Sequence, residues 1–196
     1  MNLMTRFVSF GTFLLAVAMI APRAMGAADL WAFPETMTDP EWSFLAVPST
    51  EETDKANPMD GKPEMLNPTA GRKGTYFLKA DPFTQISEIC VHPGNNHDAV
   101  LVWTATKTGK AKIKASWYPD TSASEGSKVS IRVEKMSRDG GSSKLKDETV
   151  NHNKSVKMEV DVDVREGDRI AFRLGNGGDG PTCDSTYFTV EILLIK

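Results

Sequence analysis

The chain has 196 residues, of which 40% are hydrophobic and 25% are charged, with 23 lysines and arginines against 26 aspartates and glutamates. The formal net charge of -3 leaves no basic excess that would attract a phosphate backbone, so nucleic acid is excluded as an expected partner. A single domain of this size buries enough surface to fold without a metal or a disulfide.

The N-terminus predicts export. Arg6 precedes an uncharged apolar run over 7–21, and small residues follow over 24–28, where a signal peptidase would cut. The run is short for a bilayer span, so we expect residues 1–28 to be a signal peptide; the alternative is an uncleaved N-terminal anchor. The mature protein would then be periplasmic, on the outer surface or secreted, with no transmembrane segment.

Residues 29–73 predict an irregular, proline-rich N-terminal arm that packs on the rest of the protein. The segment holds six prolines and little periodicity apart from the apolar run 42–47, which predicts one or two short strands. A disordered linker is the alternative, but Trp31, Trp42 and Phe44 make this segment too apolar for that reading.

From residue 74 to 196 the chain alternates short apolar-polar runs with turn residues. In one expected strand, Ala111, Ile113, Ala115 and Trp117 share one face, and the other face holds Lys110, Lys112, Lys114 and Ser116. The expected strands are 75–79, 86–91, 99–104, 110–118, 128–135, 156–164, 169–174 and 187–195. About eight such strands, with no helical periodicity after the leader, predict an all-β antiparallel β-sandwich of the jelly-roll type.

The two cysteines, Cys90 and Cys183, both lie in the part that we expect to be exported, where oxidising conditions preserve disulfides. We predict that they are bonded to each other, joining an early strand to the segment before the last one. Two free buried thiols are the alternative, whereas a metal site has little support from two cysteines without clustered histidines.

Several short motifs together resemble a group of secreted bacterial jelly-roll domains of the carbohydrate-binding-module-like, or lectin-like, type. The motifs are Trp42-Ser43-Phe44, His92-Pro93-Gly94, the segment 99–105 followed by Gly109, the segment 167–172, Gly175 and Asp184-Ser185-Thr186. The resemblance covers about 42–195 and implies a β-sandwich with a sugar-binding or surface role. The chain departs from the usual pattern at Thr106-Lys107-Thr108, where a proline commonly precedes the glycine.

A sugar site needs an exposed aromatic ring for the apolar face of a pyranose and planar polar groups for its hydroxyls. Loop residues of these types are the candidates for ligand binding: Tyr118, Asp120, Asn96, His97, Asp98 and His152. A plain surface loop is the alternative for each cluster. A second candidate surface, bearing Lys110, Lys112, Lys114, Arg132 and Lys157, would suit an anionic polysaccharide.

The glycine-rich segment 175–181 and the nearby Asp184 place several oxygen donors in a small region. Calcium takes six to eight oxygen ligands, so a structural calcium ion held by Asp179 and Asp184 is the candidate cofactor. Sugar-binding jelly rolls often carry such an ion, which the resemblance therefore also implies. A solvated loop is the alternative.

The common catalytic signatures are absent from the sequence. Its three histidines do not follow His-x-His or His-Glu-x-x-His spacing, and no Gly-x-Ser-x-Gly motif is present. We therefore expect no enzyme, but an exported carbohydrate-binding or cell-envelope accessory protein whose partner is a polysaccharide or a cell-envelope glycan. The alternatives are a structural or adhesive envelope protein without a glycan ligand and a polysaccharide lyase.

Overall fold

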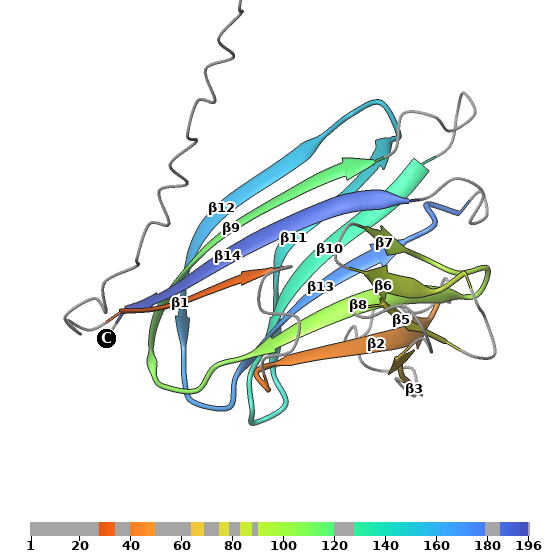
Figure 1. Ribbon diagram of the computed structural model, residues 1–196. Coiled ribbons are helices and arrows are strands. Elements are labelled where there is room, and N and C mark those ends of the chain that lie inside the picture. The colour runs from red at the N-terminus through yellow and green to blue at the C-terminus, as the bar shows by residue number, and fades with distance from the viewer. Residues whose placement is uncertain are drawn as a thin grey trace, which may run out of the picture.

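The structure is a computed structural model that describes residues 28–33, 40–49, 64–68, 75–78, 83–87, 90–119, 128–178 and 185–195. These residues form two antiparallel sheets that face each other as a sandwich, with no helix among them (Figure 1). The predicted fold class, an all-β sandwich, is confirmed.

The first sheet has eight strands in the order β12-β9-β14-β7-β6-β5-β4, with β1 also paired to β14. Its long strands are β9 (Gly109–Pro119), β12 (Val156–Val164) and β14 (Thr186–Ile195). Its shorter strands are β1 (Ala28–Phe33), β4 (Asn67–Pro68), β5 (Thr75–Phe77), β6 (Gln85–Ser87) and β7 (Val91–His92).

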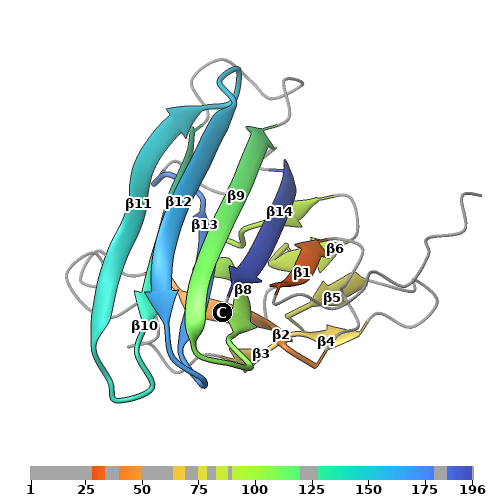
Figure 2. The same cartoon turned by 90° about the vertical axis from the view of Figure 1, so that its left-hand side faces the viewer.

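The second sheet has six strands in the order β11-β10-β13-β8-β2-β3. They are β2 (Trp42–Pro48), β3 (Glu64–Met65), β8 (His97–Thr104), β10 (Lys128–Met136), β11 (Ser142–Asn151) and β13 (Arg169–Gly175). In Figure 2, β11 and β12 stand next to each other at one margin of the sandwich, each as the last strand of its own sheet.

The core between the sheets is rich in aromatic rings. Phe188 of β14 lies 5.2 Å from Trp117 of β9 and 5.6 Å from Phe172 of β13, measured between ring centroids. Trp103 and Trp117 are fully buried, as the alternation along their strands predicts. Tilted aromatic pairs at such distances add to the stabilisation that burial alone gives.

The segment expected to be an irregular arm supplies β1, β2, β3 and β4 to the two sheets. β2 pairs with β8 along its whole length, from Trp42 opposite Trp103 to Pro48 opposite His97. β1 pairs with the C-terminal part of β14, and its Phe33 lies in the core. Prolines within this segment did not prevent pairing because Pro48 and Pro68 stand at the ends of β2 and β4.

Residues 1–27 of the predicted signal peptide 1–28 lie outside the described residues, and Ala28 begins β1, so the signal peptide stays a prediction. Across the residues that the structure does describe, no helix is long and apolar enough to cross a membrane.

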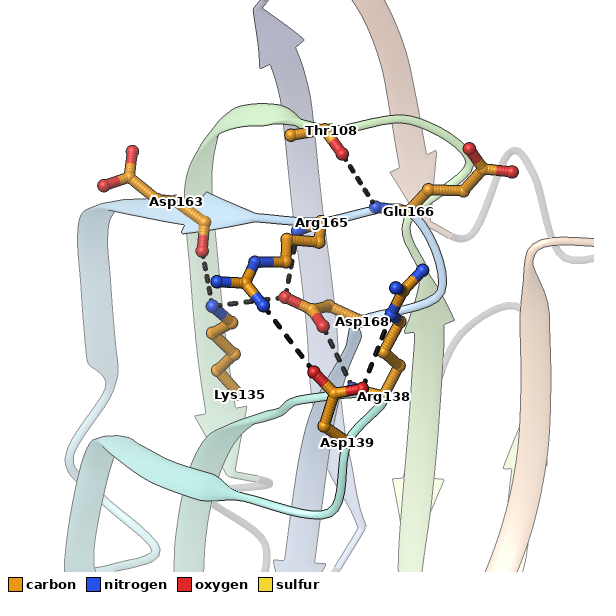
Figure 3. A network of polar contacts seen from close by, with 8 residues as sticks. All are labelled: Thr108, Lys135, Arg138, Asp139, Asp163, Arg165, Glu166 and Asp168. Carbon is orange, nitrogen blue, oxygen red and sulfur yellow. Dashed lines mark hydrogen bonds and ion pairs between the residues drawn. The ribbon is translucent and has the colours of Figure 1, made fainter.

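At the end of the sandwich that holds Ile195, called here the proximal end, residues 165–168 form the turn between β12 and β13 (Figure 3). Asp168 is 1% exposed and accepts the backbone N–H groups of Arg165 at 2.9 Å and Arg138 at 3.0 Å. Lys135 Nζ lies 3.2 Å from its carboxylate. Burial raises the pKa of Asp168, but these hydrogen bonds and the lysine outweigh burial and hold it below its ordinary value.

Candidate functional site

The other end of the sandwich, called here the distal end, gathers most of the predicted site residues. There β9 ends at Pro119, which pairs with Thr186 at the start of β14, while β13 ends at Gly175 next to the start of β8. The turn between β11 and β12 lies at the same end, because Val156 pairs with Trp117. Figure 1 shows β9 and β13 pointing toward this end, away from the label of the C-terminus.

The candidates at the start of β8 differ in exposure. Asn96 is exposed and His97 is half-buried, but Asp98 is only 7% exposed. Its carboxylate accepts hydrogen bonds from the Ser49 hydroxyl and from Arg173 Nε on β13. Asp98 is therefore occupied by an internal ion pair, which gives it a structural role that the sequence did not indicate.

The remaining predicted ligand residues also differ in exposure. His152 is 5% exposed in the turn after β11, so its ring is not presented to solvent as we expected of a loop histidine. Asp120 lies outside the described residues. Tyr118 is 40% exposed, on the outer face of the eight-stranded sheet. Of the predicted residues, Tyr118, Asn96 and His97 are the ones that the structure presents at the distal end.

The first part of the glycine-rich segment packs against the loop before β8. The Asn176 side chain donates to the carbonyls of Gly94 and Asn95, each at 3.3 Å, and accepts the N–H of Gly178 at 3.0 Å. Asp179 and Asp184, the candidate calcium ligands, lie outside the described residues. Within the described part of the chain, no group of three or more histidine, cysteine, aspartate or glutamate residues could hold a metal ion.

Tyr118 has a partner that sequence analysis missed. Tyr187, the second residue of β14, stands directly opposite Tyr118 on β9 and is 51% exposed. Side chains directly opposite each other on antiparallel strands have Cβ atoms about 5 Å apart. The two tyrosines therefore occupy adjacent outward positions on the outer face, with Ser116 and Thr189 forming the next outward-facing pair.

The same outer face continues toward β6. Thr186, Val91 and Ile86 pair in one row across β14, β7 and β6, with buried side chains. Because side chains alternate between faces, Gln85 and His92 belong to the outer face, and the Phe83 ring in the turn before β6 lies beside His92. Phe83 is 53% exposed, and its ring centroid lies 6.3 Å from that of His92, which is 8% exposed.

Among the described residues of β9, β12 and β14, the charges on the outer face are balanced. Four lysines, Lys110, Lys112, Lys114 and Lys157, share the face with four acids, Glu159, Asp161, Asp163 and Glu191. The three lysines of β9 each stand opposite an acid of β12, and Lys114 Nζ lies 3.7 Å from Glu159. The lysines therefore do not form the cationic strip that an anionic polymer would require.

Arg132, the fifth residue of the predicted cationic surface, belongs to the other sheet. It lies on β10, 3.8 Å from Glu134 and 3.6 Å from Asp147. Burial raises the pKa of Glu134 above its ordinary value, although Arg132 and Arg173 lower it. Burial also raises the pKa of Asp147, but Lys144 and Arg132 outweigh it and the net shift is downward. The single lysine-arginine surface expected from the sequence does not form.

Cys90 lies between β6 and β7, half-buried, and is a free thiol in the structure. Its N–H donates to the Ser87 hydroxyl at 3.1 Å, which closes the turn between the two strands. Its predicted partner, Cys183, lies outside the described residues, so the disulfide stays a prediction.

No protein-family model matches the chain, and no curated protein is significantly similar to it. Among solved structures, murine APRIL is 12% identical, with 79% of this chain and 99% of that chain covered and a TM-score of 0.37. The carbohydrate-binding module CBM35 from Cellvibrio japonicus Abf62 is 13% identical, with 86% and 97% covered and a TM-score of 0.34. The CBM22-1 xylan-binding domain from Paenibacillus barcinonensis Xyn10C is 14% identical, with 52% and 74% covered and a TM-score of 0.31. At such low identities and TM-scores, none of these likenesses assigns a ligand to this chain.

Proposed function

We propose that this chain is an exported, non-catalytic carbohydrate-binding protein whose ligand lies on the outer face of the eight-stranded sheet at the distal end. The observation that carries the proposal is the exposed pair Tyr118 and Tyr187, directly opposite each other on β9 and β14. Sugar rings present C–H groups on one face and hydroxyls at their rim, and exposed phenol rings among hydroxyl side chains complement both.

The surroundings of the tyrosines support this reading. Ser116 and Thr189 supply hydroxyl groups in the neighbouring outward pair, and both lie on rigid central strands rather than on loops. A large exposed apolar area would instead suit a protein partner, but here the next outward row holds Lys114, Glu159 and Glu191.

Affinity gel electrophoresis of the full chain through gels containing individual polysaccharides tests the proposal. We expect one polymer to retard the protein, and Tyr118→Ala and Tyr187→Ala each to weaken the retardation about tenfold, which corresponds to ~1.4 kcal/mol. Tyr118→Phe and Tyr187→Phe should retain most of it, because the ring face remains.

Leu30→Ala is the matched control, because Leu30 is 56% exposed and lies on the proximal part of the same face. It should leave retardation unchanged. Absence of retardation by every neutral and anionic polymer tried would refute the proposal and leave a structural envelope protein as the reading of the fold.

A further inference from the structure

The exposed aromatic rings of the described residues are not scattered. Apart from Leu30, the large apolar side chains exposed in this part of the chain are Phe83, Tyr118 and Tyr187, and all three belong to the outer face of the eight-stranded sheet near its distal end.

Phe83 stands well apart from the tyrosines. Thr186, Val91 and Ile86 form one row of paired residues across three strands. Counted along the strands, Tyr187 lies one residue beyond this row in one direction, and Phe83 lies three residues beyond it in the opposite direction. Four residues at 3.3 Å and two strand spacings at 4.8 Å separate the Cα atoms of Tyr187 and Phe83 by about 16 Å. One sugar ring cannot contact both.

The described residues between these rings are small or polar. Cys90 and Ser87 occupy the turn beside Tyr187, and Gln85 stands opposite His92 on the way to Phe83. Gln85 is half-buried and carries an amide group, whereas Ser87 is 9% exposed and its hydroxyl bonds the backbone of Cys90. The rings of His92 and Phe83 are tilted by 32° to each other at a centroid distance of 6.3 Å.

We infer that the ligand is an uncharged polysaccharide chain several residues long, held at one end by Tyr118 and Tyr187 and at the other by Phe83. This inference rests on the proposed function. Its length follows from the separation of the rings, and its neutrality follows from the balance of four lysines and four acids among the described residues of β9, β12 and β14.

The experiment measures affinity for defined oligosaccharides of one to six residues, cut from the neutral polymer that best retards the full chain, by titration calorimetry. For the unmodified protein we expect affinity to rise with length and level off at about four residues. Phe83→Ala should lower the affinity for the longest oligosaccharide about tenfold and leave that for the disaccharide unchanged. Tyr187→Ala should weaken both.

Outcomes distinguish this inference from the proposed function. If Tyr187→Ala abolishes binding but Phe83→Ala has no effect at any length, the site is a short one and the inference fails while the proposed function stands. Stronger binding to alginate or a sulfated galactan than to neutral polymers, lost at high salt, would overturn the neutral class. No binding by the unmodified protein would overturn both. Equal melting temperatures of the variants exclude unfolding as the cause.

Discussion

Lys135 Nζ lies 3.2 Å from Asp168 Oδ2, which joins β10 to the turn between β12 and β13 (Figure 3). The same lysine donates to the carbonyl of Asp163 at 2.6 Å, at the end of β12. The pair thereby connects strands of both sheets at the proximal end, because β12 belongs to the eight-stranded sheet and β10 to the six-stranded sheet.

Removing this carboxylate should destabilise the fold. Asp168→Ala leaves two backbone N–H groups and the Lys135 ammonium without their acceptor, so we expect a loss of about 3 kcal/mol of unfolding free energy in urea. Glu166→Ala, in the same turn, is the control, because the Glu166 side chain is exposed and its contact to Thr108 uses only the backbone N–H. An equal effect of the two changes would contradict the assigned role.

The pKa of Asp168 predicts a pH dependence. Since its folded pKa lies below its ordinary value of 3.8, its ionisation stabilises the fold above that pH, and the stabilisation disappears as the pH falls through the folded pKa. Asp168→Asn should therefore be less stable than the unmodified protein at neutral pH, and the gap should narrow below about pH 4. A constant gap down to pH 2 would show that Asp168 does not titrate as expected.

Gly177 at the distal end should not tolerate a side chain. Its φ is +65°, and a Cβ there would lie 2.6 Å from the carbonyl oxygen of Lys128. Gly177→Ala should cost roughly 2–3 kcal/mol of unfolding free energy, because strain and a backbone clash add. Gly178→Ala is a matched control with φ of +90° and open space around its Cβ, and should cost only about 1 kcal/mol.

The predicted disulfide can be tested directly. Cys90 directly precedes Val91, which pairs with Thr186 at the start of β14, whereas Cys183 lies outside the described residues. We expect mass analysis of the exported protein to find no alkylated cysteine without reductant and two alkylated cysteines after reduction. Two alkylated thiols before reduction would end the disulfide assignment and agree with the free thiol of Cys90.

The calcium proposal has its own readout. If Asp179 and Asp184 hold the ion, a chelator should lower the melting temperature, and calcium but not magnesium should restore it, because the two ions differ in the ligand geometry they accept. Asp179→Asn should remove the response. A melting curve that chelator leaves unchanged would end this proposal without affecting the aromatic face.

The sequence predicted strands where one face is buried and the other solvated. β9 and β12 follow this rule along most of their length, so the alternation of apolar and polar residues in the sequence predicted both strands. β11 was not predicted, because this last strand of its sheet is exposed on most of both faces and its residues 142–149 show no apolar alternation. The expected strand 86–91 is instead two short strands, β6 and β7, joined by a turn in which Ser87 N–H donates to the Cys90 carbonyl at 2.8 Å.

Only part of the candidate site could be predicted from the sequence, because its residues are brought together by strand pairing. Tyr118 stood out because it ends a strongly alternating strand, but its value depends on Tyr187, which is 69 residues away in sequence and adjacent only through the register of β9 and β14. The outward phase of Tyr187 in the last expected strand was the available signal. Asp98 and His152 have side chains suited to sugar binding, but the structure does not present them to a ligand. Asp98 is ion-paired with Arg173, and His152 is buried in a turn; neither effect can be read from the neighbouring sequence.

Amide chemical-shift mapping of the full chain, titrated with the longest neutral oligosaccharide that binds, tests the central claim most directly. We predict that the largest shifts fall at Tyr118, Tyr187 and Phe83, on the outer face of the eight-stranded sheet at its distal end. Shifts concentrated in the turn 137–141 at the proximal end, or on the six-stranded sheet, would contradict it.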